Sequence, residues 1–394
     1  MAAKTLPLDL YKVIEYGLAG GSWQQFVDHY NEIYDSFVVD GFEFAPTKID
    51  YTFSQLIAST GATTLPAYVD PEAPGYEKAL KALAGAMGNI PTQKAFYSLN
   101  RVTLLEKMQL INKFGPAALT PEMQDVFIGM LDESTDGLIK GYYNALTHQR
   151  MRVVSTGHFI IDGTNNPRGL QGIDIDFNIA SDHFDTLTTT KRWWTNADHT
   201  TEGSASDPIG YIKDRYEKDI RKKFHSRIPM HLEMSDDLWS DFIGHSAVLK
   251  AVGYMLYPLA QSDAAAIQAA RNLPLDSLKA NIERIIGLKI VVRDSLSWVD
   301  RPDSENHTVV QEEVENFDPK NIAFVPDGKI GDIQGVTPLT LGYDADKVAT
   351  FNGGRLVLTQ RANPETHSIY IESEAAQLCV PSAVQHMYIS TVTA

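Results

Sequence analysis

The chain has a single cysteine, Cys379, among its 394 residues. An intramolecular disulfide is therefore impossible, and zinc sites built from several thiolates are excluded. A sequence so poor in cysteine is typical of a protein from a reducing compartment.

Long apolar runs and basic tails are also missing. No stretch of 18 or more apolar residues occurs, so we expect no transmembrane helix and no membrane partner. The N-terminal stretch has acids among its apolar residues and no small-residue cleavage site, which is unlike a secretory signal peptide. The formal net charge of −16 argues against a protein that reads nucleic-acid sequence, but is compatible with a wall that encloses DNA without gripping it.

Familiar catalytic and cofactor motifs are absent as well. The sequence has no Walker loop, dinucleotide-binding fingerprint, Gly-x-Ser-x-Gly elbow or His-Glu-x-x-His pair. We therefore expect no cofactor, no metal and no catalytic residue of these types. With 43% hydrophobic and 21% charged residues, the composition is that of a globular protein with two or three packed units.

The most regular pattern in the chain predicts one long helix from Thr120 to about Arg150. Thr120 is a good N-cap and Pro121 suits the first helical position, and apolar residues then recur at helical spacing. Such a helix is roughly 45 Å long, which suggests a part that spans something. We expect a pair of strands after it, within 151–179, because apolar residues alternate with Asp and Asn from Ile173 to Ile179.

The regions before the long helix look less compact. Residues 1–45 are rich in aromatics for a terminal segment and must pack on their own body or on a neighbour. Residues 46–100 are rich in turns and read as a long excursion, with a weak helix between Gly75 and Gly88 and extended chain at 96–99.

The C-terminal half alternates helices and strands, which predicts an α+β fold. A helix begins at Pro208, after an Asp N-cap, and runs to about Phe224. The expected elements that follow are a strand at 228–234, helices at 238–245 and 275–286, a strand at 288–292, and late strands at 322–325, 355–359, 367–372 and 387–392.

Two groups of acids are candidates for chemistry. Asp174 and Asp176 point the same way on one strand, as the paired carboxylates of a glycosidase-like hydrolase would, or as solvated surface would. Asp182 and Asp185, with His183 between them and a second histidine, His199, nearby in the sequence, could hold a cation or simply form a polar turn. A carboxylate-based hydrolase is therefore the alternative function.

Aromatic residues supply the other candidates. Trp193 and Trp194 could stack on a ligand, or divide between core and interface. His231 and Glu233 share one strand face, which we interpret as a polar face beside buried methionines and leucine. The candidate inter-subunit contacts are Trp23, Tyr30, Tyr68, Tyr76, Trp193 and Trp194.

Six local phrases occur in a fixed order along the chain. They are Gly88-Asn89-Ile90-Pro91, the stretch from Ser155 to Ile161, the stretch from Gly172 to Phe177, Arg192-Trp193-Trp194, Asp207-Pro208-Ile209 and the stretch from Phe324 to Gly328. In this order, over most of residues 45–394, the chain resembles a tailed-phage major capsid protein with the Hong Kong 97 fold, of the lambda-type major capsid protein E family.

The resemblance implies a non-enzymatic head protein of a double-stranded DNA bacteriophage, which self-assembles into the hexamers and pentamers of an icosahedral shell. Its partners would be itself, a portal, a scaffold and decoration proteins, with DNA enclosed without sequence-specific binding. It would be found in the virion capsid, and in the host cytoplasm during assembly. The implied parts are an N-terminal arm (1–45), an extended loop (46–105), a peripheral domain (106–204) with its spine helix at 120–150, an axial domain (205–300), and C-terminal strands (301–394) returning mainly to the peripheral domain.

Overall fold

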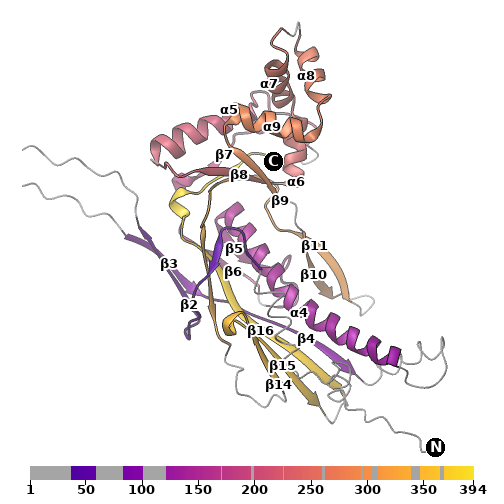
Figure 1. The fold of residues 1–394 in the computed structure, drawn as a ribbon. Coiled ribbons are helices and arrows are strands. Elements are labelled where there is room, and N and C mark those ends of the chain that lie inside the picture. The colour runs from indigo at the N-terminus through magenta and orange to yellow at the C-terminus, as the bar shows by residue number, and fades with distance from the viewer. Residues whose placement is uncertain are drawn as a thin grey trace, which may run out of the picture.

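Helix α4 (Pro121–Thr156) forms the axis of the lower half of the molecule, and a large sheet lies against it (Figure 1). The computed structural model describes residues 37–58, 83–100, 121–169, 171–196, 199–224, 226–259, 262–293, 296–302, 309–338, 347–363 and 368–394. Most of the aromatic-rich N-terminal segment and most of the turn-rich excursion lie outside these residues.

The long helix is present but ends later than expected. It extends six residues beyond Arg150, because Val153 and Val154 are fully buried on the helix instead of beginning a strand. It stops at Gly157, which has a left-handed φ of 77° and donates its backbone N–H to the Val153 oxygen at 2.9 Å. This is a helix-ending motif that favours glycine, and a Cβ here would lie 2.8 Å from the Phe184 ring.

A six-stranded sheet packs against α4, with its longest strand at the centre. Its strands are β1 (Phe42–Phe44), β4 (Thr92–Asn100), β13 (Gly331–Val336), β14 (Lys347–Phe351), β15 (Leu356–Asn363) and β16 (Ser368–Pro381). On one side β16 pairs with β15, and on the other side it pairs with β4 and then with β13. The sheet therefore joins segments from both ends of the chain.

Three two-stranded ribbons project from this body. They are β2 (Thr52–Ala58) with β3 (Leu83–Asn89), β5 (His158–Ile161) with β6 (Ile173–Asp176), and β10 (Leu296–Pro302) with β11 (Val309–Glu315). The weak helix expected between Gly75 and Gly88 is wrong over its described part, because Leu83–Asn89 pairs along its whole length with β2. Pairing with β2 therefore determines the conformation of this segment, although its local pattern weakly favours a helix.

The upper half contains a five-stranded sheet covered by helices. The strands follow the order β7 (Phe184–Thr186), β17 (Tyr388–Thr391), β12 (Asn321–Pro326), β8 (Met230–Ser235) and β9 (Lys289–Arg293). The helices are η1 (Ser181–His183), α5 (Pro208–Asp214), η2 (Arg215–Lys223), α6 (Asp236–Gly244), α7 (Ser246–Leu256), α8 (Asp263–Arg271) and α9 (Leu275–Ile286). The helix expected from Pro208 to about Phe224 is confirmed, with π geometry in its second part, η2.

Each half has its own hydrophobic core. Below, Ile139 and Leu146 of α4 pack with residues of the six-stranded sheet, including the lone cysteine, Cys379. Burial raises the pKa of the Cys379 thiol to about 12, so the thiol is protonated and unreactive at neutral pH. Above, Phe242 and Ile282 belong to a second cluster built from the helices and the five-stranded sheet. The fold is α+β, as predicted.

Candidate functional site at the junction of the two cores

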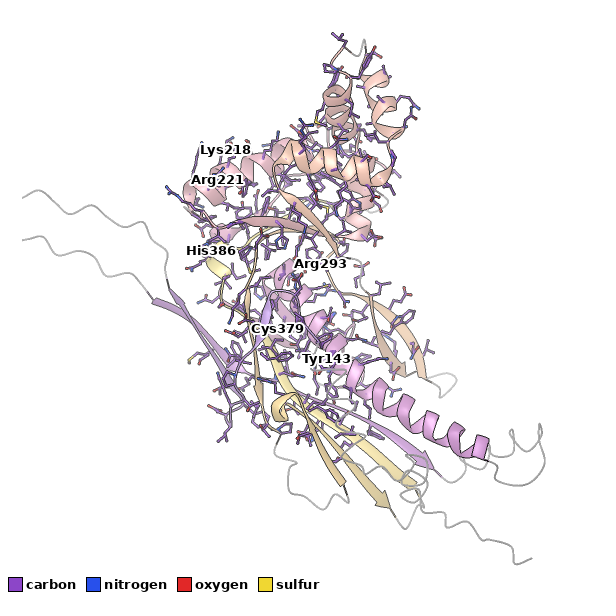
Figure 2. All side chains as sticks on the ribbon, viewed as in Figure 1. Tyr143, Lys218, Arg221, Arg293, Cys379 and His386 are labelled. Carbon is purple, nitrogen blue, oxygen red and sulfur yellow. The ribbon has the colours of Figure 1, made fainter. Side chains whose placement is uncertain are left out.

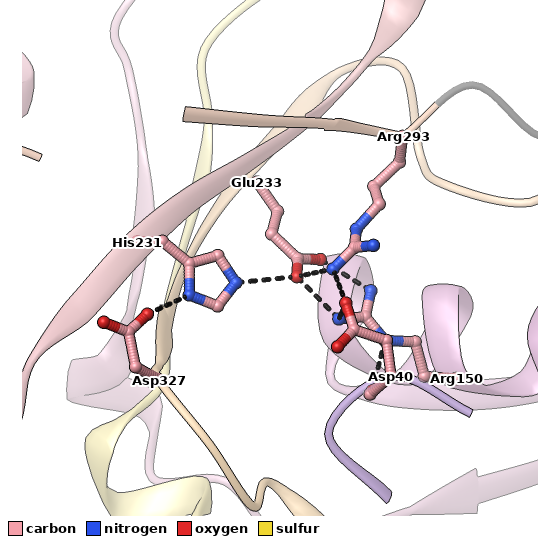
Figure 3. A network of polar contacts seen from close by, with 6 residues as sticks. All are labelled: Asp40, Arg150, His231, Glu233, Arg293 and Asp327. Atoms are coloured by element: carbon pink, nitrogen blue, oxygen red, sulfur yellow. Dashed lines mark hydrogen bonds and ion pairs between the residues drawn. The ribbon is translucent and has the colours of Figure 1, made fainter. Parts of the chain in front are cut away.

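A buried carboxylate lies where the two halves meet. Glu233 of β8 is fully buried and accepts two hydrogen bonds from the Arg150 guanidinium of α4, both at 2.6 Å. Arg293 of β9 also forms an ion pair with Glu233. Figure 3 shows both guanidinium groups converging on this one carboxylate. Burial alone would raise the pKa of Glu233, but Arg150, His231 and Arg293 outweigh it and hold the pKa well below its usual range.

The N-terminal segment closes one side of the network. Asp40 lies just before β1, and its carboxylate accepts a hydrogen bond from Arg293 at 2.5 Å. Its backbone oxygen accepts from Nε of Arg150 at 3.1 Å. Asp40 itself is exposed, so the network reaches from a dry centre to the surface.

A histidine closes the other side. His231 lies two residues before Glu233 on β8, and its Nε2 is 3.0 Å from the Glu233 carboxylate. Its Nδ1 is 2.6 Å from Asp327, which follows β12. Burial lowers the pKa of His231, but the two carboxylates more than offset this and raise it above its ordinary value. With His231 protonated, three cations face three carboxylates.

This arrangement can hold elements together but offers little for catalysis. Every oxygen of Glu233 is occupied by Arg150, Arg293 or His231, so its carboxylate has no free position from which to take a proton. The network ties α4 and Asp40 to β8, β9 and the end of β12. Removing one partner from such a buried group leaves an uncompensated charge, which is costly. We therefore interpret it as a structural junction, defined by Asp40, Arg150, His231, Glu233, Arg293 and Asp327.

The sequence predicted only part of this junction. The spacing of His231 and Glu233 predicted that they share one polar strand face. In the structure their side chains are 3.0 Å apart and Glu233 is fully buried, so the pair is internal to the molecule. Their partners, Arg150 and Arg293, come from segments far away in the chain, and no local pattern links them. A buried-type strand that contains a glutamate was the one available signal, since such a charge requires a partner.

The structure does not support the first acid pair as a catalytic site. Asp174 and Asp176 lie on the exposed face of β6, with side chains 56% and 60% exposed. Asp174 lies 3.2 Å from Nδ1 of His158, and Asp176 accepts a hydrogen bond from the Asn178 backbone. Solvated acids of this kind do not form the enclosed pair that a glycosidase-like hydrolase needs.

The second acid pair is divided between different partners. Asp185 accepts a hydrogen bond from Tyr211 at 2.7 Å and pairs with Arg215 at 2.8 Å. Asp182 pairs instead with Lys223, at 3.2 Å.

The two histidines near these acids also make separate contacts. Nδ1 of the buried His183 lies 2.7 Å from the Met387 backbone oxygen, and His199 pairs with Asp241. Within the described residues, no group of three or more His, Cys, Asp and Glu side chains could hold a metal ion. The Asp182–Asp185 stretch therefore belongs to ordinary surface ion pairs.

The paired tryptophans lie inside the upper core. Trp193 is fully buried and packs 5.1 Å from Phe242, measured between ring centroids. Trp194 is 8% exposed and meets the edge of His245 at 5.5 Å. Their burial in this subunit argues against the expected interface role for either ring. The other four candidate contacts, Trp23, Tyr30, Tyr68 and Tyr76, lie outside the described residues.

One groove of about 560 Å³ lies between α4, β4 and the β10–β11 hairpin. It contains His148, whose Nδ1 is 2.8 Å from Asn316 and whose burial lowers its pKa to about 4. His148 is therefore neutral at neutral pH, and neither predicted acid pair lines the groove. Among the helices that the structure describes, none has the length and apolar character needed to cross a membrane.

The described residues thus form an elongated α+β molecule with a hydrophobic core in each half and a charged junction between the halves. A family model described as phage major capsid protein E matches residues 60–392. The chain belongs to this family, and its function is that of a capsid protein. The family and the two-core fold agree with the expected Hong Kong 97-like capsid architecture.

Solved structures of phage-derived proteins are similar to this chain. A phage-related protein from Bordetella bronchiseptica RB50 is 12% identical, with 96% of each chain covered and a TM-score of 0.45. A putative prophage capsid protein from E. coli CFT073 is 13% identical, with 78% and 79% covered and a TM-score of 0.43. The satellite phage P4 procapsid with size determination protein is 11% identical, with 94% and 99% covered and a TM-score of 0.43. No curated protein matches the chain.

Proposed function

We propose that this chain is the repeating subunit of a tailed-phage head and self-assembles into the hexamers and pentamers of an icosahedral shell. The observation that carries this proposal is the capsid-family match over residues 60–392. The junction around Glu233 supports it, because a shell subunit must keep its two halves in a fixed relation while several neighbours pull on it.

The two cores suggest how the domains divide. The peripheral domain would contain α4 and the six-stranded sheet, and the axial domain would contain the helices of 205–300. The upper core also takes Ile322, Phe324 and Tyr388 from the C-terminal region. We therefore propose that the strands of 301–394 serve both domains, with β12 and β17 completing the axial one.

Two segments would reach neighbouring subunits. We propose that the arm lies within residues 1–45 and the extended loop within residues 46–105, outside β1 and β4, which pair within the six-stranded sheet. The β2–β3 ribbon, which is the described base of that loop, leaves the side of the body in Figure 1. A heterologous contact repeated around a ring is the geometry that closes a capsomer. Trp23, Tyr30, Tyr68 and Tyr76 remain proposed contacts within these segments.

The remaining partners follow from the proposed role. The shell would meet a portal, a scaffold and decoration proteins, and would enclose DNA without reading its sequence, with no membrane partner and no cofactor. Subunits would assemble in the host cytoplasm before residing in the virion. We infer a structural and non-enzymatic role, which the solvated acids of β6 support.

Electron microscopy of the expressed protein tests the proposal directly. The full-length chain, purified and concentrated, should form rings or closed shells in negative stain. A chain lacking residues 1–36, which keeps Asp40 and β1 in place, should remain folded but assemble poorly. A protein that stays monomeric at high concentration, alone and with scaffold protein added, would contradict the proposal. If the truncated chain forms normal shells, only the proposed role of the arm is contradicted.

A further inference from the structure

The β10–β11 hairpin presents an acidic and apolar face to solvent. Strand alternation and the pairing register place Leu296, Trp298 and Asp300 on one face, opposite Glu315, Glu313 and Gln311 respectively. Leu296 is 51% exposed, and Trp298, which also lines the groove beside the hairpin, is 59% exposed, so the two form an exposed apolar pair on one face. The other face holds the buried Val314 and turns toward the body. We call the exposed side, made by Leu296, Trp298, Asp300, Glu313 and Glu315, the acidic face.

The charge on this face is poorly compensated. Between Leu296 and Glu315 the sequence has six Asp and Glu but one Arg, and that Arg301 pairs with Glu312 on the opposite face of the hairpin. Partial burial and the neighbouring charges of Asp237 and Asp318 raise the pKa of Glu315, although Arg152 partly offsets this. The ionised form of a carboxylate that lies among like charges would be stabilised by a cationic side chain from a partner.

A basic surface with matching character lies on the upper half of the same chain. Between Lys213 and Arg227 the sequence has seven Lys and Arg against three Asp and Glu, within a chain of net charge −16. Lys218, Arg221, Lys222 and Arg227 are exposed, and Ile228 beside them is 39% exposed. Arg221 lies over the Tyr216 ring, 5.7 Å from its centroid. We call Lys218, Arg221, Lys222, Arg227 and Ile228 the basic strip.

The two surfaces cannot meet within one subunit. Lys218 and Arg221 lie at the upper left of the molecule in Figure 2, whereas β10 and β11 lie on the right side in the same view in Figure 1. A contact between unlike patches on opposite sides is heterologous, and it repeats from copy to copy until a ring closes. We propose that the acidic face of one subunit binds the basic strip of the next copy of this chain.

This inference rests on the proposed assembly function and names one of its contacts. Opposite charges across such a contact steer association and set its register, while Trp298, Leu296 and Ile228 supply apolar area that is excluded from water. Because the charges lie at the surface, the contact weakens as salt is raised.

Charge reversal on either surface tests the contact. Glu313→Lys and Arg221→Glu should each raise the concentration needed for half-maximal capsomer formation about tenfold at ~0.1 M salt, because attraction becomes repulsion. Matched controls are Asp276→Lys and Arg271→Glu, which reverse exposed charges on α9 and α8. Sedimentation velocity measures assembly, and an unchanged melting temperature shows that each variant is folded.

Combining the two charge reversals in one chain gives the decisive test. The double variant Glu313→Lys/Arg221→Glu should assemble within about threefold of the wild type, since attraction is restored with inverted sign. An equal mixture of the two single variants should assemble only by alternation, which gives rings with an even number of subunits and no pentamers. Single variants that assemble like the wild type, or a double variant no better than either single one, would overturn the contact.

The outcomes also distinguish a failure of this contact from a failure of the proposed assembly function. A wild-type protein that never assembles would overturn both the proposed function and this contact. If the wild type assembles and the charge-reversed variants assemble equally well, only the proposed contact is overturned. If Arg221→Glu weakens retention of double-stranded DNA on a filter and leaves assembly unchanged, the basic strip binds nucleic acid instead and the proposal fails.

Discussion

The lower and upper halves of this molecule are stabilised by different kinds of contact. In the lower half, β4 pairs with β16 along nine residues, from Thr92 opposite Ala376 to Asn100 opposite Ser368, so the sheet depends on segments from opposite ends of the chain. In the upper half, successive helices from Pro208 to Ile286 pack on one another and on a smaller sheet. The helices of the upper half are therefore defined mainly by local sequence, whereas the lower sheet is defined by long-range register. The upper sheet shares that long-range character, because β17 pairs with β7 and β12 pairs with β8.

Helix starts illustrate the local character of the upper half. The Ser235 hydroxyl accepts a hydrogen bond from the Leu238 backbone at 3.2 Å, and Asp207 accepts from Gly210 at 3.0 Å. Each cap satisfies a backbone donor that a helix start leaves unpaired. Long-range pairing has no such local marker and carries a larger cost of loop closure. The junction at Glu233 joins the two halves, together with the apolar cluster in which α4 packs with Ala323, Val325 and Ile389 of the upper sheet.

The largest expected effect comes from breaking that junction. Arg150→Met should destabilise the protein by about 3–5 kcal/mol, because Glu233 loses its bidentate partner while remaining buried. We expect the wild type to unfold in one transition in urea, because the junction couples the halves, and the variant to unfold in two, one for each half. Circular dichroism and tryptophan fluorescence followed together would detect the split, since Trp193 and Trp194 report on the upper half.

Two further variants make this result specific. Arg284→Met removes an exposed arginine from α9 and should change stability by less than about 0.5 kcal/mol. The double variant Arg150→Met/Glu233→Met should recover much of the lost stability, because it leaves no unpaired carboxylate. A single, unchanged transition in Arg150→Met would show that the halves are held together by apolar contacts instead.

A second substitution affects the packing of the upper half alone. A Cβ at Gly253 of α7 would lie 2.0 Å from the Ala266 backbone oxygen of α8, so Gly253→Ala must push the two helices apart. We expect a loss of about 1–3 kcal/mol. The matched control is Gly141→Ala on α4, where a Cβ meets nothing within 4 Å and helix propensity should stabilise by about 0.5–1 kcal/mol. Urea titrations that gave both variants the same sign would contradict this explanation.

A smaller loss is expected at the rim of the upper core. Truncating a fully buried tryptophan costs about 3–5 kcal/mol, but Trp239 of α6 is not fully buried. Instead it is half-buried, with its ring 5.8 Å from Phe242 and 6.0 Å from Nζ of Lys279. We therefore expect Trp239→Ala to cost about 2 kcal/mol, less than Phe242→Ala, which empties a fully buried site. Equal losses in urea denaturation would show that the tryptophan is more enclosed than this.

The smallest effect should appear as a pH dependence of the junction. The pKa of His231 is raised above its ordinary value of 6.5, so its stabilisation is complete below that value and is lost as pH rises through the folded pKa. The pKa of Glu233 is lowered from 4.5, so its stabilisation is complete above that value and is lost on acidification. The junction should therefore be most stable between about pH 4.5 and 6.5.

Melting temperatures across this range test the assignment. The difference between the wild type and His231→Gln should shrink as pH rises from 6 to above 8, because deprotonation removes what the substitution has already removed. Arg284→Met, the exposed control on α9, should show no such trend. If the difference in melting temperature instead grows with pH, protonated His231 does not stabilise the junction.

Much of the fold followed from local pattern. The start of α4 at Pro121, the alternation that buries Ile175 and Phe177 while exposing Asp174, and the helix beginning at Pro208 all agree with the structure. The end of α4 was misjudged because valines favour strands locally, although Gly157 was a usable stop signal. The strand at Leu83–Asn89 was missed because its reason for being extended is its partner, β2.

The junction marks the boundary between what sequence and tertiary structure decide. The sequence by itself determined the long helix, the α+β class, the absence of familiar catalytic motifs and the resemblance to capsid proteins, because these depend on neighbouring residues and their order. Only the tertiary structure decided that Arg150, Glu233 and Arg293 meet, and that Trp193 and Trp194 are core residues. Burial and charge pairing arise from segments that are brought together in space, and neither is encoded within one local stretch of chain.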